Sequence, residues 1–147
     1  MLLLGSFPSE ESLRRGEYYA NPRNQAWRLL GALCGAHPEL PYRERLDVLV
    51  RSGIALWDVL EACERQGSLD AAIRKGSERP NDIAGFLERH PSVRVIGLNG
   101  RTAQATLARH FASLAEPRVR LVSLPSSSSA HAALSLDAKL RAWSALI

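Results

Sequence analysis

The sequence predicts an α/β fold in which helices cover both faces of a mainly parallel sheet. Four short apolar runs indicate strands, at residues 2–5, 54–59, 93–98 and 118–124. Segments with helical periodicity separate these runs, and this alternation is typical of βαβ units. The 147 residues, 46% of them hydrophobic, suffice for a single domain, 1–147, built around one core.

The first run, LLLG at 2–5, is apolar throughout, as in a strand that is covered on both faces. The second, IALWDV, is almost as apolar. The third and fourth, VRVIGL and RVRLVSL, begin by alternating with arginine and then turn apolar. Each run therefore fits a strand of a sheet that lies between helices.

Five segments between and after these runs are predicted to be helical. In the first of them Trp27, Leu30 and Leu33 recur at helical spacing. Asn81 opens the third as its capping residue, and Ser135 caps the fifth. The second ends in a glycine suited to a C-cap, and the fourth directly follows a strand. The segments are 24–34, 42–53, 81–91, 101–114 and 135–147. Residues 73–83 show no such pattern, and we expect a surface loop there.

Charge and composition narrow the classes of function. The net charge is +4, which permits a polyanionic partner without requiring one. Only Lys75 and Lys139 are lysines among the 19 cationic residues, so lysine is absent from nearly all candidate chemistry. Cys34 and Cys63 lie far apart and outside any CxxC pair, which indicates two buried thiols. We therefore expect no metal and no cofactor.

The chain has no apolar run of the length that crosses a membrane. Its first residues lack the basic leading segment of a secretory signal, and the apolar run there is short. We therefore expect a cytoplasmic protein.

Polar residues follow three of the predicted strands. GSFPS lies at 5–9, LNG at 98–100 and LPSSSSAH at 124–131. The carboxyl ends of parallel strands meet at one edge of a sheet, so these segments should form one cleft. Asparagine amides can pair with the edge of a base, tyrosine can stack on its face, and a serine loop can hold a phosphate through backbone N–H groups. The expected cleft contains Ser6, Phe7, Tyr19, Asn21, Asn24, Asn99, Ser126, Ser127, Ser128 and Ser129.

Several common sites are missing from the sequence. No GxGxxG follows the first strand and no GxxxxGK[ST] occurs, which argues against dinucleotide and P-loop sites. No GxSxG occurs, which argues against an α/β-hydrolase. Asp58, at the second strand, is either a general base or a carboxylate that caps a local turn.

Taken together, the segments at 5–27, 56–73, 95–100 and 124–131 resemble the uracil-DNA glycosylase superfamily, and within it the hypoxanthine (deoxyinosine) DNA glycosylases. The resemblance runs from Leu3 to about Trp143. It implies a three-layer αβα sandwich around a four-stranded parallel sheet. It also implies that the partner is DNA with a deaminated base flipped out of the duplex, and we expect a monomer.

The resemblance assigns roles to several residues of the expected cleft. Asn24 matches best the asparagine that orients the attacking water, with Asn21 as the second choice. Tyr19 falls where relatives stack a ring on the target base. Asn99 falls where a strand-end asparagine reads the base edge.

Other positions depart from relatives or are expected to touch DNA. Phe7, beside Ser6 against the base, takes the place of the polar water-activating residue of a Gly-x-Asp-Pro motif. Leu124 replaces a histidine or asparagine that often begins the last loop. The loop corresponds to one that relatives press into the minor groove. The expected DNA contacts are Arg23, Ser126, Ser127, Ser128, Ser129 and His131.

Structural roles compete with several of these assignments. Asn24 could cap the following helix, Asn99 could belong to a turn with Gly100, and the serines could cap the last helix. Arg14 and Arg15 by default form a solvated face. Trp27 is expected in the core.

The resulting hypothesis is a monofunctional glycosylase that removes hypoxanthine first, because both lysines lie far in sequence from the cleft segments. Two alternatives stay open. One is a uracil or mixed-specificity glycosylase of the same fold, and the other is a nucleic-acid or nucleotide-binding domain without catalysis.

Overall fold

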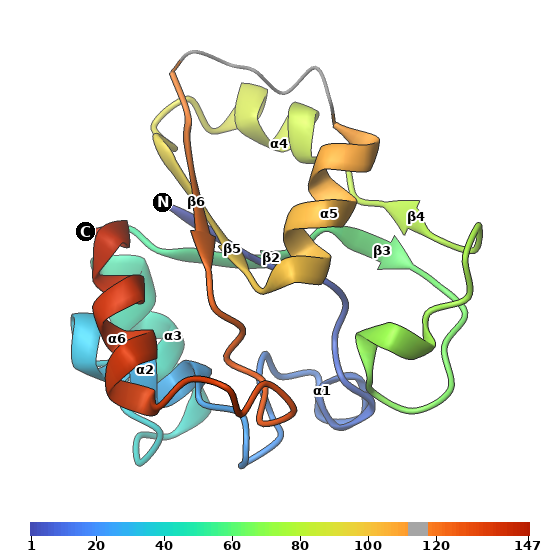
Figure 1. Ribbon diagram of the computed structural model, residues 1–147. Coiled ribbons are helices and arrows are strands. Elements are labelled where there is room, and N and C mark those ends of the chain that lie inside the picture. Colours follow the sequence, from blue (N-terminus) through green and yellow to red (C-terminus); the bar gives the residue numbers. More distant parts are fainter. Residues whose placement is uncertain (112–117) are drawn as a thin grey trace.

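The computed structural model, which describes residues 1–111 and 118–147, has four parallel strands at its centre (Figure 1). Their order across the sheet is β2-β1-β5-β6, with every neighbouring pair parallel. All four predicted runs therefore form strands of one sheet. The bounds are Leu2–Gly5 for β1, Ala55–Asp58 for β2, Val95–Asn99 for β5 and Arg120–Leu124 for β6.

Helices cover both faces of this sheet and complete the predicted sandwich (Figure 1). The strand β1 shows why its sequence is apolar throughout. Leu2 and Leu4 pack against one helical layer and Leu3 packs against the other, and all three are fully buried. Burying each such side chain stabilises the fold by about 2 kcal/mol. One layer holds α4 (Ile83–Arg89) and α5 (Arg101–His110), and the other holds α2 (Ala26–Cys34), α3 (Tyr42–Arg51) and α6 (Leu136–Trp143).

The helix ends confirm one predicted cap and correct another. Ser135 caps α6, because its side chain accepts from the Ala138 N–H. The cap of α4 is Asp82 and not Asn81, since Asp82 Oδ1 accepts from the Gly85 N–H at 2.9 Å. Asn81 instead donates through Nδ2 to the backbone oxygen of Asp58 at 2.9 Å, which ties it to the end of β2.

Three short elements were not predicted. The helix α1 (Glu10–Arg15) begins after Ser9, whose hydroxyl accepts from the Ser12 N–H. The strands β3 (Leu60–Ala62) and β4 (Arg79–Pro80) form a small antiparallel pair. Part of the segment 73–83 is thus a strand and not only a loop. A two-residue strand that contains proline offers no alternation to detect.

Three further expectations concern the helices and the cysteines. The predicted helix 101–114 ends as α5 at His110, and its positions 112–114 lie outside the described residues. None of the helices in the described part of the chain has the length and apolarity needed to cross a membrane. Cys34 and Cys63 are free thiols and are half-buried, which is less than predicted.

Candidate active site

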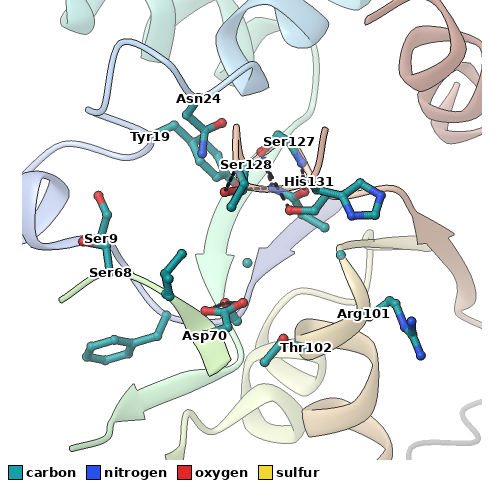
Figure 2. Close-up of a pocket in the computed structure, with 18 of the residues that line it drawn as sticks. Ser9, Tyr19, Asn24, Ser68, Asp70, Arg101, Thr102, Ser127, Ser128 and His131 are labelled. Atoms are coloured by element: carbon teal, nitrogen blue, oxygen red, sulfur yellow. Dashed lines mark hydrogen bonds between the residues drawn. The ribbon is translucent and has the colours of Figure 1, made fainter. Parts of the chain in front are cut away.

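The carboxyl ends of the central strands open into a cavity of about 1090 Å³ (Figure 2). This volume is at the upper end for small-molecule sites and is sufficient for a purine nucleoside. The cavity brings together the three polar segments that follow β1, β5 and β6, as the parallel topology predicts. All the residues predicted for the cleft line it, together with Arg23 and His131. In the view of Figure 2, Tyr19 and Asn24 lie across the cavity from Asp70.

Tyr19 is held in an uncommon backbone conformation. Its φ angle is +53°, and among the described residues it is the one non-glycine residue with a positive φ. A bulky side chain in this region costs about 1–3 kcal/mol, so neighbouring contacts must impose it. The Tyr19 ring packs edge-on against Trp27 with centroids 6.3 Å apart. The Trp27 indole N–H in turn donates to the Tyr18 carbonyl, and Trp27 is buried in the core as predicted.

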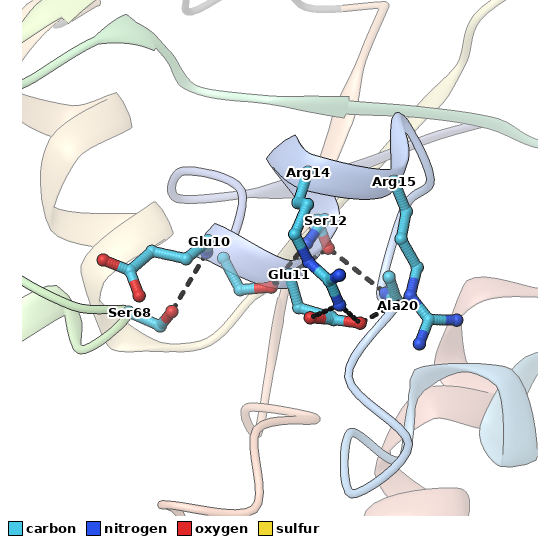
Figure 3. Close-up of polar contacts among 8 residues, drawn as sticks. Glu10, Glu11, Ser12, Arg14, Arg15, Ala20 and Ser68 are labelled. Atoms are coloured by element: carbon cyan, nitrogen blue, oxygen red, sulfur yellow. Dashed lines mark hydrogen bonds and ion pairs between the residues drawn. The ribbon is translucent and has the colours of Figure 1, made fainter.

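The residue after Tyr19 is anchored to α1 by a buried hydroxyl (Figure 3). Ser12 Oγ accepts from the Ala20 N–H at 3.1 Å, and Ser12 is only 7% exposed. On the outer side of α1, Arg14 and Arg15 both pair with Glu11, as expected of a solvated face. The inner side of α1 therefore positions the tyrosine segment.

We expect the Ser12→Ala variant to be less stable by about 1–2 kcal/mol, because it leaves the Ala20 N–H without a partner. Denaturant unfolding measures the loss. The matched control is Arg15→Ala on the exposed side of the same helix. A surface ion pair contributes at most about 1 kcal/mol, so this variant should stay close to the parent protein. Equal losses in both variants would contradict the anchoring role of Ser12.

Asn99, the last residue of β5, joins three parts of the cavity wall. Its Oδ1 accepts from the Ser127 N–H at 2.8 Å, and its Nδ2 donates to Ser127 Oγ at 2.8 Å. The second hydrogen of Nδ2 reaches Tyr19 Oη over a longer distance, 3.3 Å. Burial raises the Tyr19 pKa, with a further rise from Asp58, so the phenol stays neutral. Asn99 therefore fixes the tyrosine and the serine loop relative to each other.

Asn24 lies on the cavity wall just before α2. Its Oδ1 accepts from the Ala26 N–H at 2.9 Å, so the competing role as a helix-capping side chain is real. An amide oxygen has two lone pairs, and this contact uses one of them. Nδ2 donates to no described residue. Asn24 can therefore cap the helix and still accept a hydrogen bond from a water in the cavity.

The serine loop, Ser126–Ser129, is tied inward at its centre and open at its tip. Ser127 is 1% exposed, and its carbonyl accepts from the Gln25 N–H. The prediction that Ser127 contacts DNA is therefore corrected, because its polar groups are turned to the protein. Ser129 is exposed, while Ser126 and Ser128 are half-buried. Their hydroxyls accept from backbone N–H groups inside the loop.

Two neighbours hold this loop from below. Gly100 has φ +96°, and a Cβ there would lie 2.9 Å from the Ser126 Cβ, so only glycine fits. The buried ammonium of Lys139 donates to the His131 carbonyl and to Gln25 Oε1, both at 2.9 Å. Burial lowers the Lys139 pKa, and neither Lys139 nor Lys75 lines the cavity.

Asp58 forms part of the cavity floor at the end of β2. The residue is 6% exposed, and no described residue donates a hydrogen bond to its carboxyl oxygens. A methyl group on Gly5, its register partner on β1, would overlap Asp58 Oδ1 and come within 3.8 Å of Tyr19 Oη. Burial and the nearby Asp70 carboxylate raise the pKa of Asp58 to about 7, with Arg65 acting in the opposite sense.

Ser6, Phe7 and Asp70 form the side of the cavity next to Asp58. Ser6 Oγ lies 2.8 Å from both carboxylate oxygens of Asp70 and donates to them. The Arg65 guanidinium lies 5.0 Å from the Phe7 ring centroid and 3.9 Å from Asp70 Oδ1. Phe7, which stands where relatives carry a polar residue, is therefore packed against a buried cation and supplies no polar group.

Comparison with known proteins places this site in a family. No family model matches the chain. A protein named hypoxanthine DNA glycosylase from Methanosarcina acetivorans is 44% identical over 104 residues, which is 70% of this chain and 65% of the relative. One of the same name from Methanosarcina barkeri is 36% identical over 102 residues, 69% of this chain and 63% of the relative. The chain thus spans slightly less than two thirds of these curated relatives.

A solved structure covers more of the chain. The solution NMR structure of a candidate uracil DNA glycosylase from Methanosarcina acetivorans is 37% identical and superposes with a TM-score of 0.79. The match covers 99% of this chain and 86% of that one. The chain belongs to the uracil-DNA glycosylase superfamily, in its hypoxanthine branch. The sandwich and its four-stranded parallel sheet are those implied by the resemblance of the sequence.

Two residues of this superfamily member were missing from the sequence-based site. Asp58 was weighed as a general base or a local cap, and the structure places it on the cavity floor without a capping contact. Arg101, the first residue of α5, was not considered, yet it lines the cavity and is exposed. Its place directly after the strand-end Asn99-Gly100 pair was the available signal.

Proposed function

We propose that this chain is a monofunctional DNA glycosylase that hydrolyses the bond between hypoxanthine and its deoxyribose and leaves an abasic site. One observation carries the proposal. Tyr19, Asn24 and Asn99 come from three separate segments and line one cavity, in a chain 44% identical to a protein named hypoxanthine DNA glycosylase. A flat base, an attacking water and a hydrogen-bonding amide can meet there.

Tyr19 and Asn99 hold the flipped base. The tyrosine ring is fixed by its backbone and by Trp27, so it offers a rigid face for stacking. Asn99 keeps both short hydrogen bonds to Ser127. Its second amide hydrogen, held by Tyr19 Oη at 3.3 Å, turns to the base edge. The amide then stabilises the negative charge that builds on the departing base.

Asn24 orients the water that attacks the sugar. Its Oδ1 accepts a hydrogen from this water through the lone pair that the Ala26 N–H does not use. A neutral amide is a weak base, so the bond to the base must be largely broken before the water adds. Deaminated purines depart more readily than normal ones, which suits such a reaction.

Basic and small polar residues at the mouth of the cavity contact the DNA. Arg23 and Arg101 line the cavity, and neither forms an ion pair with a described residue. The exposed tip of the serine loop, with His131, fills the gap that the flipped base leaves. Flipping costs a few kcal/mol and costs least for a weakly paired base such as hypoxanthine opposite thymine. The DNA-contacting set is Arg23, Arg101, Ser126, Ser128, Ser129 and His131. The protein acts as a monomer with one domain.

The reaction forms no covalent intermediate with the protein. A Schiff base needs an amine beside the sugar, and within the described residues no lysine lines the cavity. Lys139 is occupied by two hydrogen bonds behind the loop.

Labelled duplexes that carry hypoxanthine, uracil or xanthine at one position test the proposal. We expect alkali-dependent strand breaks with hypoxanthine above all, and no adduct trapped by borohydride. Breaks mainly with uracil would favour the uracil alternative. Tight binding without breaks would favour a domain without catalysis, and a borohydride adduct would refute monofunctional hydrolysis.

A further inference from the structure

A buried carboxyl group faces the cavity and has no role in the reaction described so far. Asp58 is 6% exposed and lines the cavity, and its carboxyl oxygens accept no hydrogen bond from a described residue. Buried polar groups are nearly always satisfied, so one that is left open toward a cavity indicates a ligand contact. Asp70, in contrast, is partly exposed and satisfied by Ser6.

The position of Asp58 shows which part of a substrate it would meet. Its Oδ1 lies above Gly5, at the end of the central strand β1, in the space that the Tyr19 hydroxyl also faces. This is the floor of the cavity. A flipped nucleotide remains attached to its DNA strand through the sugar, so the base reaches furthest inward. Asp58 therefore meets the base and not the sugar or the water.

We propose that Asp58 donates its proton to N7 of the flipped hypoxanthine as the base departs. The proposal rests on the function proposed above and adds an acid to it. Hypoxanthine, like guanine, presents N7 and O6 as acceptors along one edge. N7 shares the five-membered ring with N9, so a proton there directly neutralises the charge left by bond breaking.

The step conserves atoms and electrons. The C1′–N9 bond breaks and its electron pair goes to N9, while the proton of the Asp58 carboxyl moves to N7. The base leaves as neutral hypoxanthine. The oxygen of the water held by Asn24 bonds to C1′ and loses one proton, which returns through solvent to the Asp58 carboxylate once the base has left. One water is consumed, and the enzyme is restored.

The charges around Asp58 support the neutral form. Asp70 faces it from the short turn Asp70–Ala72 and disfavours ionisation, as does burial, and Arg65 favours it. Tyr18 and Tyr19 face it from the segment after α1, and their own raised pKa values keep them neutral. Of these groups only Arg65 opposes protonation, so the pKa of Asp58 lies at about 7 and the acid form is present at neutral pH.

Single-turnover excision of hypoxanthine, with enzyme in excess, tests the proposal across pH 5.5–9, a range of about two units either side of neutrality. We expect the parent rate to fall as pH rises through the Asp58 pKa. Asp58→Asn should be about 100-fold slower at the acidic end, since an amide can donate a hydrogen bond but not a proton. Its rate should also be flat across the range.

Two further variants keep the test decisive. Asp70→Asn preserves the acceptor for Ser6 and removes the repelling charge, so its alkaline limb should move to lower pH. Histidines also titrate in this range, so His131→Gln is the matched control and should keep the limb. A parent-like limb in Asp58→Asn, or an unmoved limb in Asp70→Asn, would overturn the acid role. If the parent protein leaves hypoxanthine in place but cleaves uracil or nothing, the proposed function fails instead.

Discussion

Replacing Asn24 by alanine is expected to slow hypoxanthine excision by about 100-fold. The variant loses the amide that orients the water, and removing one positioned dipole from a transition state costs roughly 3 kcal/mol. It also loses the acceptor of the Ala26 N–H, which should lower the free energy of unfolding by about 1 kcal/mol. Single-turnover kinetics and denaturant unfolding measure the two effects separately.

The comparison variant is Asn21→Ala in the same segment. Asn21 also lines the cavity, and its Oδ1 accepts from the Arg23 N–H at the exposed end of the turn. A loss of excision much larger in the Asn24 variant assigns the water to Asn24. A loss confined to the Asn21 variant would transfer the role to Asn21, and unchanged excision by Asn24→Ala would remove Asn24 from the mechanism.

Replacing Asp58 by asparagine is expected to stabilise the protein at alkaline pH by up to about 4 kcal/mol. The folded carboxyl has a pKa of about 7, against an ordinary value of 3.8. Between these values the native state holds a proton that the unfolded state has released, so rising pH removes stability. Each unit of pKa difference corresponds to about 1.4 kcal/mol, and the full cost applies above the folded pKa.

Denaturant unfolding of both proteins from pH 4 to pH 9, a window that extends beyond both ends of the Asp58 titration, measures this effect. The difference between the two proteins should be small at the acidic end and should widen as pH rises to about 7. Other titrating groups cancel in the difference. Stability curves that run parallel over the whole range would show that Asp58 ionises normally. A variant that is more stable and yet less active would be typical of a group kept for function at a cost in stability.

Much of the fold could be predicted because the pattern in the sequence is local. The leucines of β1 are apolar on both faces, and they are indeed buried between two helical layers. Ser135 caps α6, as its place before a helical pattern indicates. The strand β4 could not be predicted, because Arg79–Pro80 pairs with a partner that only the folded chain supplies.

The candidate site shows the same limit. That Tyr19, Asn24 and Asn99 share one cavity follows from the parallel topology. The paired hydrogen bonds between Asn99 and Ser127 depend on the depth at which the loop sits, and spacing alone does not give this. The environment of Asp58 is likewise made by distant residues, Arg65 and Asp70, and no local pattern records their charges.

The hydrogen bonds from Asn99 to Ser127 and Tyr19 exist before any nucleic acid arrives. The parts of the wall that would grip the base and wedge the helix are thus braced against each other. Under the proposed function, most of the distortion needed for repair then falls on the duplex. The lifetime of each base pair, more than any closing movement of the protein, would set how fast a damaged position is found.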